Sequence, residues 1–172
     1  MTAQDILRQL ISGYHEVLEQ TVGDCGQETL DRNLPNATIT SIGSIYVHLV
    51  VGEDDMLHGM LQGKPGIYKG QGWERRTGVE APPMDQFTPE WGRKVRLNLP
   101  LFREYAKAVY AATDAYIARL SDADLARKVQ TGFIGEQSVA FVIANIFGWH
   151  IAEHTGEIAA LKGVLGLKGL PF

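Results

Sequence analysis

The chain has 172 residues, of which 45% are hydrophobic and 21% charged, an ordinary composition that excludes a disordered or fibrous protein. Sixteen Lys and Arg residues against 20 Asp and Glu residues give a net charge of −4, which disfavours nucleic acid and acidic membrane surfaces as partners. The single cysteine, Cys25, cannot form an intrachain disulfide, and the N-terminus lacks the apolar run of a signal peptide. No stretch is apolar enough over ~20 residues to cross a membrane, so we expect a cytoplasmic protein.

Two amphipathic segments in the first half of the chain are predicted to be helices. Residues 3–22 have apolar side chains at steps of three and four, behind a Thr2-x-x-Asp5 capping signal. Residues 40–62 form the second segment, whose inward face carries unusually polar and small residues. Residues 63–87 contain five Gly and three Pro, which predicts a long connection without regular structure.

Two further helical segments are predicted in the second half. One begins at Thr88-Pro89 and continues to about residue 120, with either a kink at Pro100 or a short helix followed by a longer one over 100–120. The other covers about 138–165, and no stretch alternates as a strand would. The sequence therefore predicts one all-α domain over residues 1–172, a four-helix bundle with a long loop between its second and third helices.

The histidines are the residues most indicative of chemistry. His150 and His154 are four residues apart on a predicted helix, so both imidazoles can reach one metal ion. His48 lies on the inward face of the second helix and is the candidate third ligand, whereas His58 falls on another face. His15 is predicted to pack between helices or lie at the surface, with a place in the lining of the pocket as a third alternative. Burial of three imidazoles side by side favours a metal site, because an ion satisfies one nitrogen of each ring.

Two carboxylates accompany the histidines of the last helix. The string His150-Ile-Ala-Glu153-His154 fits the H-x-x-E-H signature of inverted zinc peptidases, but only 18 residues remain to supply a further ligand. Glu153 is a candidate general base or an exposed surface residue. Glu157 shares the row of both histidines and is the stronger candidate for a carboxylate that contacts a ligand histidine. Three neutral imidazoles suit Zn, Ni, Cu or Fe and leave an open position, as in catalytic sites.

Two segments of the chain resemble the DinB/YfiT-like family of metal-dependent four-helix-bundle proteins. TSIGSIYVHLVVGEDDML is similar to the second helix of that family, with its ligand at His48. WHIAEHTGEIAALKGVLGLKG is similar to the last helix, with the H-x-x-x-H-x-G-[QE]-I pattern at His150, His154 and Glu157, where Gln is usual. The resemblance implies a nickel or zinc site, frequent dimers and, in some relatives, use of a low-molecular-weight thiol.

Three functions are compatible with these residues. The first is a metal-dependent S-transferase that uses a low-molecular-weight thiol, with Trp73, Arg75 and Arg76 of the long loop as candidate residues for binding that cofactor. The second is a metal-dependent hydrolase with Glu157 or Glu153 as catalytic base. The third is a non-catalytic metal- or ligand-binding protein of a stress response. In the enzyme hypotheses the substrate is a small molecule.

The C-terminal tail predicts the oligomeric state. Leu165, Leu167, Leu170 and Phe172 form an apolar segment that a monomer must cover or expose. A homodimer that pairs through helix surfaces away from the metal site would bury it, and the alternative is a tail that folds back onto its own bundle.

Overall fold

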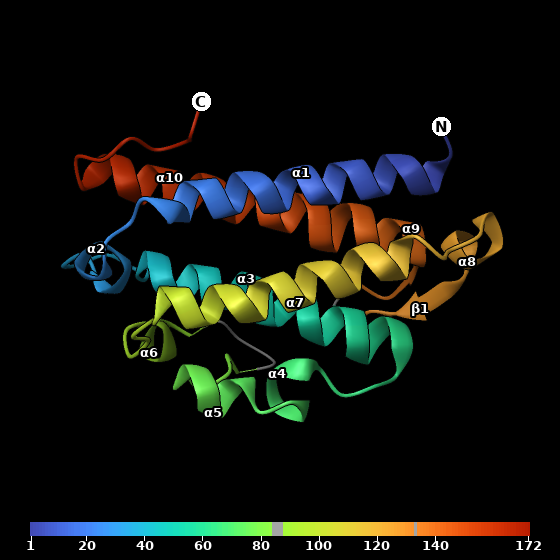
Figure 1. Cartoon of the computed structure of the whole chain (residues 1–172), viewed down its shortest axis with the longest axis horizontal. Helices are drawn as coiled ribbons and strands as arrows, with labels where there is room; N and C mark the ends of the chain where they lie inside the picture. Colours follow the sequence, from blue (N-terminus) through green and yellow to red (C-terminus); the bar gives the residue numbers. More distant parts are fainter. Residues whose placement is uncertain (84–87, 133) are drawn as a thin grey trace.

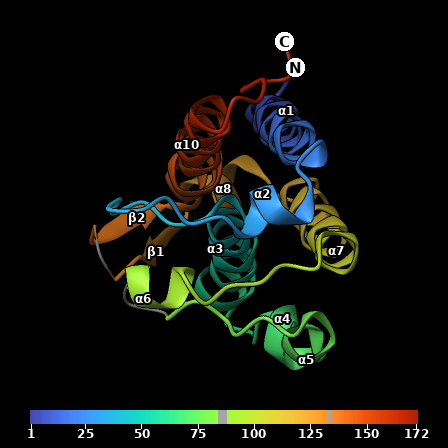
Figure 2. The ribbon, with the colours of Figure 1, turned by 90° about the vertical axis from the view of Figure 1, so that its left-hand side faces the viewer.

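The computed structural model describes residues 1–83, 88–132 and 134–172, and it is an all-α four-helix bundle with one small hairpin. The long helices lie side by side along the molecule (Figure 1). Seen from one end they form a ring in which α1 contacts α7 and α10, and α3 contacts the same two helices (Figure 2). The long helical segments of the ring are α1 (Ala3–Gly23), α3 (Ile42–Asp55) with the π-helical η1 (Met56–Met60), α7 (Leu99–Ile117), and the η2 (Val142–Trp149) and α10 (His150–Val164) pair.

The sequence predicts the long helices closely because their ends carry capping residues. Thr2 and Asp5 form the predicted capping box at the start of α1. Ser41 accepts a hydrogen bond from the Ser44 backbone at the start of α3. Ser138 caps the short α9 (Val139–Phe141), which leads into η2 and α10. Each cap satisfies a backbone N–H that would otherwise lack a partner, and so fixes where the helix begins.

The segment around Pro100 forms a short helix followed by a longer one, which is the second of the two outcomes that the sequence predicts. The short α6 (Pro89–Gly92) starts behind Thr88, as the Thr-Pro signal predicts. The long α7 then begins anew, with Pro100 in its first turn and the Asn98 side chain accepting from Leu101 N. Proline is tolerated in a first turn because its missing N–H has no partner there in any helix.

The long connection between the second and third long helices, of which residues 84–87 lie outside the described residues, carries two short helices that the sequence does not predict. It contains the short helices α4 (Ile67–Gly70) and α5 (Trp73–Thr77). The buried Asp54 carboxylate accepts hydrogen bonds from Ile67 N and Tyr68 N, at 3.0 and 2.8 Å, and so caps α4. A Cβ on Gly66 would lie 2.8 Å from Asp55 Oδ1, which explains the glycine at this close approach. A cap supplied from 13 residues away leaves no local sequence signal.

Two short strands, which no alternating pattern in the sequence predicts, accompany the helices. Strands β1 (Lys128–Gln130) and β2 (Glu136–Ser138) pair antiparallel between α8 (Asp122–Ala126) and α9. Each strand has three residues, too few for an alternating pattern to be recognised. The short α2 (Gln27–Asp31) was likewise not predicted.

The core consists of two apolar clusters that Tyr14 of α1 joins. The larger cluster includes most of α3 together with Phe102 and Tyr105 of α7, and the smaller one surrounds η2. In the described parts of the chain, no helix combines the length and apolarity that a bilayer crossing requires. The C-terminal tail packs only in part: Leu165 contacts the larger cluster, whereas Leu167 and Phe172 are exposed.

Candidate metal centre

Three histidines from two neighbouring helices come together inside the bundle. His48 lies in the middle of α3, and His150 and His154 lie one turn apart at the start of α10. The Nε2 atoms of His48 and His150 are 3.2 Å apart, and one ring nitrogen of each histidine lies within 4.8 Å of the other two. All three side chains are half-buried. Among the residues that the structure describes, no other group of three His, Cys, Asp or Glu side chains meets this spacing.

This geometry fits one divalent ion. Two ligand atoms of a tetrahedral site with bonds of about 2.0–2.1 Å are about 3.3 Å apart. The 3.2 Å between the Nε2 atoms of His48 and His150 is therefore close to the separation that a shared ion imposes. The third nitrogen, on His154, is near enough to complete the set with small side-chain movements. Because three protein ligands leave a fourth position open, the donor set is that of a catalytic rather than a structural site.

A π-helical segment leads directly into the two histidines of α10. The η2 helix ends at Trp149, and a π-turn shifts the phase of the residues that follow it. Within η2, a Cβ on Gly148 would lie 3.1 Å from Tyr14 Cε2 and 3.3 Å from Ile11 Cδ1 of α1. Glycine therefore permits close packing of α1 against η2, and this packing fixes the helix immediately before His150.

The comparison with protein families agrees with this arrangement. The family model described as the DinB superfamily matches residues 11–158, a range that includes all three histidines. The chain belongs to the DinB superfamily. Among solved structures, it is similar to the crystal structure of the conserved protein of locus from Enterococcus faecalis, with 19% sequence identity, a TM-score of 0.80, and coverage of 96% of this chain and 99% of that one. This likeness confirms the fold, and no curated protein matched the chain.

Burial keeps two histidines of this DinB superfamily member neutral. Burial, together with the neighbouring His154, lowers the pKa of His48 to about 4. Burial and the neighbouring histidines lower the pKa of His150 to about 3. Near neutral pH both imidazoles therefore carry an uncharged nitrogen, the form that binds a metal.

The two candidate carboxylates of α10 occupy different positions. Glu157 Oε2 lies 2.5 Å from Nδ1 of His154, which holds the ring and leaves Nε2 to face the other histidines. Such a contact fixes the tautomer of a ligand histidine. Glu153 is exposed, and within the described residues it makes no hydrogen bond or ion pair. The structure thus brings Glu157 to the histidine cluster through His154, while Glu153 points to solvent.

The predicted cofactor-binding residues of the long loop do not join the histidines. Helix α5 packs on α4 and α7, and both views place it across the bundle from α10 (Figures 1 and 2). Trp73 is buried in the core, and the Arg76 guanidinium lies 3.6 Å from the centre of its ring. Arg76 also pairs with the exposed Glu104, and Arg75 is exposed. Their role in binding a thiol stays a prediction that this placement does not support.

The two remaining histidines, His15 and His58, each contact a buried carboxylate of α3. His15 Nε2 lies 2.8 Å from Glu53 Oε2, and His58 Nδ1 lies 2.7 Å from Asp54 Oδ1. His15 is buried, which agrees with the prediction that it packs between helices. The two acids were not singled out from the sequence, although two adjacent carboxylates inside an apolar helical stretch are a signal of buried polar partners.

Proposed function

We propose that His48, His150 and His154 hold one divalent metal ion at the centre of a metal-dependent enzyme that acts on a small molecule. The observation that carries this proposal is the convergence of three ring nitrogens within 4.8 Å of one another. Two imidazole nitrogens 3.2 Å apart can share one proton, but a third imidazole beside them needs a further partner. One ion satisfies all three.

Imidazole donors suit Zn, Ni, Cu and Fe, and the resemblance to the DinB/YfiT-like family favours Zn²⁺ or Ni²⁺ among them. When bound, such an ion keeps an open position and supplies a Lewis acid that lowers the pKa of a coordinated thiol or water. The part of Glu157 is to orient His154 through its Nδ1 atom. His48 and His150 are half-buried, so the helices around them limit the access of water to the open position.

For the reaction, we favour an S-transferase that takes a low-molecular-weight thiol as co-substrate. Family membership supports this choice, because some of the proteins that the chain resembles use a low-molecular-weight thiol. The second candidate is a hydrolase in which Glu153 accepts a proton, favoured by an exposed carboxylate one residue from His154. The third is a binding protein without turnover.

The experiment that separates these functions starts from untagged protein. Metal analysis after purification should give one Zn or Ni per chain in the wild type and in His58→Gln, a control histidine outside the cluster, and none in His48→Ala. The metal-loaded protein is then tested for conjugation of small thiols to an aryl halide and for cleavage of simple esters. Thiol-dependent conjugation supports the transferase, ester cleavage without thiol supports the hydrolase, and neither reaction with retained metal supports the binding protein. Retention of metal by His48→Ala would contradict all three.

We further propose that the chain forms a homodimer in the cytoplasm. Val164 and Phe172 are 70% and 83% exposed, and Leu167 is exposed beside them. Pairing of two copies would cover these apolar side chains. Light scattering should give about twice the 18.9 kDa of one chain, and a mass near 18.9 kDa would contradict the dimer.

A further inference from the structure

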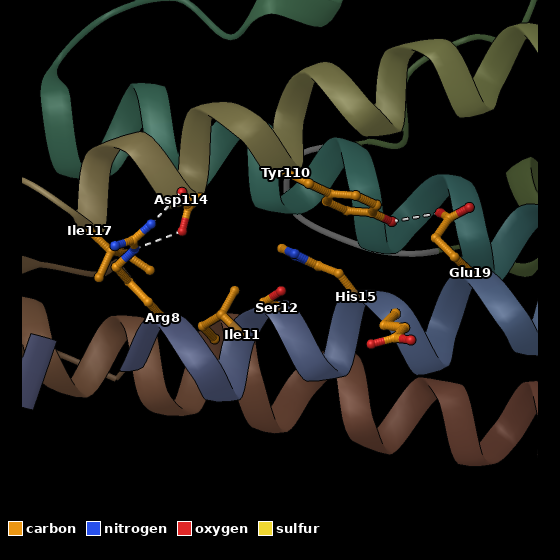
Figure 3. Close-up of a pocket in the computed structure, with 9 residues that line it drawn as sticks. Arg8, Ile11, Ser12, His15, Glu19, Tyr110, Asp114 and Ile117 are labelled. Atoms are coloured by element: carbon orange, nitrogen blue, oxygen red, sulfur yellow. Dashed lines mark hydrogen bonds and ion pairs between the residues drawn. The ribbon is translucent and has the colours of Figure 1, made fainter. Parts of the chain in front are cut away.

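A cleft lies between α1 and α7, away from the histidine cluster. The cleft measures about 290 Å³ and is lined by side chains of these two helices (Figure 3). In the ring of long helices, α1 and α7 stand opposite the α3 and α10 pair that carries the cluster (Figure 2). This volume lies just below the roughly 300 Å³ at which pockets for drug-sized ligands start, so the cleft has room only for a small organic molecule. Nothing in the proposed metal chemistry uses it.

The floor of the cleft is a rigid aromatic pair. His15 is buried and its ring stacks on Tyr110, with 3.8 Å between the ring centroids. Behind it, His15 Nε2 lies 2.8 Å from Glu53, whose other carboxylate oxygen accepts a hydrogen bond from Thr113. The floor is therefore held in place before any ligand arrives.

The charge of the lining is negative. Arg8 is the lining cation, and it is held by Asp114 through two contacts of 2.8 Å. Glu19 is held by Arg103 at 3.0 Å. Glu16 has a Gln20 amide at 3.0 Å, and no Lys or Arg pairs with it in the described parts of the chain.

The buried pair behind the cleft does not offset that charge. The His15 imidazole already has its own carboxylate partner, because its Nε2 atom lies 2.8 Å from Glu53 Oε2. The lining thus keeps one carboxylate, Glu16, without a basic partner, in a cleft whose remaining charges are matched. This surplus favours a cation as ligand.

The rest of the lining is apolar. Ile11 and Ile117 are buried core residues at the wall of the cleft, and Tyr110 offers an aromatic ring beside them. Ser12 lines the cleft one helical turn before Glu16 on α1, and its hydroxyl can accept a hydrogen bond. We propose that this cleft binds a small organic amine, with its protonated nitrogen beside Glu16 and Ser12 and an apolar body on Ile11, Ile117 and Tyr110.

The test compares three probes of one shape on the full chain: phenethylammonium, the neutral phenethyl alcohol and the anionic phenylpropanoate. Backbone amide shifts are followed by NMR during titration with each probe. The amine should give saturable shifts that map to α1 and α7, and should bind at least about threefold more tightly than the alcohol, as one exposed ion pair allows. Equal binding of amine and alcohol, or no saturable shift from the amine up to about 10 mM, would overturn the proposal.

Two pairs of variants locate the site. Glu16→Gln should weaken amine binding about two- to fivefold, and Glu28→Gln, an exposed carboxylate on α2, should not. Ser12→Phe should abolish binding by filling the cleft, and Ala111→Phe, an exposed α7 position outside the lining, should not. Amine binding that survives Ser12→Phe would contradict this location.

A last variant separates this inference from the proposed metal chemistry, because an amine can also coordinate a metal ion. His48→Ala should lose the metal and keep amine binding on α1 and α7. Loss of amine binding in His48→Ala would assign the amine to the histidine cluster and overturn the proposal for the cleft, whatever the fate of the metal.

Discussion

Residues of helix α3 take part in two kinds of histidine site, and the two kinds differ in which groups contact the ring nitrogens. His15 and His58 each meet a buried carboxylate, Glu53 or Asp54, at 2.8 and 2.7 Å. His48 and His150 instead point their Nε2 atoms at each other, 3.2 Å apart, with His154 beside them. A histidine paired with a buried acid stabilises the fold, whereas imidazoles that face one another form a donor set for an ion.

The largest effect on folding is expected at the carboxylate side of this comparison. Asp54 is fully buried and also accepts a hydrogen bond from Tyr105 at 2.9 Å. Asp54→Ala removes the partner of His58 and the cap of α4, so we expect a loss of about 3 kcal/mol or more in the free energy of unfolding, measured with urea. The neighbour Asp55, whose pKa is raised by burial and by Asp54, is the control. A larger loss from Asp55→Ala than from Asp54→Ala would contradict this ranking.

The opposite result is expected at the histidine cluster. His150→Ala should lower the affinity for Zn²⁺ more than about 100-fold, beyond the 10- to 100-fold typical of residues that only contact a ligand. The free energy of unfolding of the metal-free protein should change little or rise, because a buried imidazole near two others is removed. Titration calorimetry and urea unfolding measure the two quantities. An unchanged Zn²⁺ affinity would contradict the assignment of His150 as a ligand and leave it a structural role only.

Glu157 gives an intermediate effect. Its contact with His154 Nδ1 orients a proposed ligand, so Glu157→Gln should weaken Zn²⁺ binding by about 10- to 100-fold. Glu153→Gln is the matched control on the same helix, and its Zn²⁺ affinity should equal that of the wild type. If both variants bind Zn²⁺ like the wild type, the contact to His154 does not act on the ligand set.

A further effect is expected on the pH dependence of stability without metal. The pKa of His48 is about 4 and that of His150 about 3 in the folded chain, against about 6.5 when unfolded. Between these values the unfolded chain binds more protons, so stability is lost as pH falls below 6.5. We expect a slope of up to about 2.7 kcal/mol per pH unit in this window, about 1.4 from each histidine, measured by urea unfolding in a chelator, and a slope about half as steep for His48→Gln. A slope unchanged in that variant would contradict the assignment.

The sequence predicts the four long helices and the histidine cluster for different reasons. Caps such as Thr2 and Ser41 act within four residues, so a local pattern suffices to place a helix start. The i, i+4 spacing of His150 and His154 is local as well, and a buried face on the second helix identified His48. These features need no knowledge of distant contacts.

What the sequence could not predict depends on contacts between distant segments. Helix α4 forms because Asp54, 13 residues earlier, caps it, and the strands of the hairpin are three residues long. The placement of Trp73 in the core, across the bundle from α10, follows from packing on α7 rather than from any local pattern. The partners of His15 and His58 lie on a buried helix face that local periodicity does not distinguish from an apolar one.

X-ray absorption at the zinc edge of protein loaded with one equivalent of Zn²⁺ tests the metal centre most directly. We expect three imidazole nitrogens at about 2.0–2.1 Å and one further light atom. An oxygen-dominated shell, or fewer than two imidazoles, would contradict the assignment of His48, His150 and His154 as the ligands.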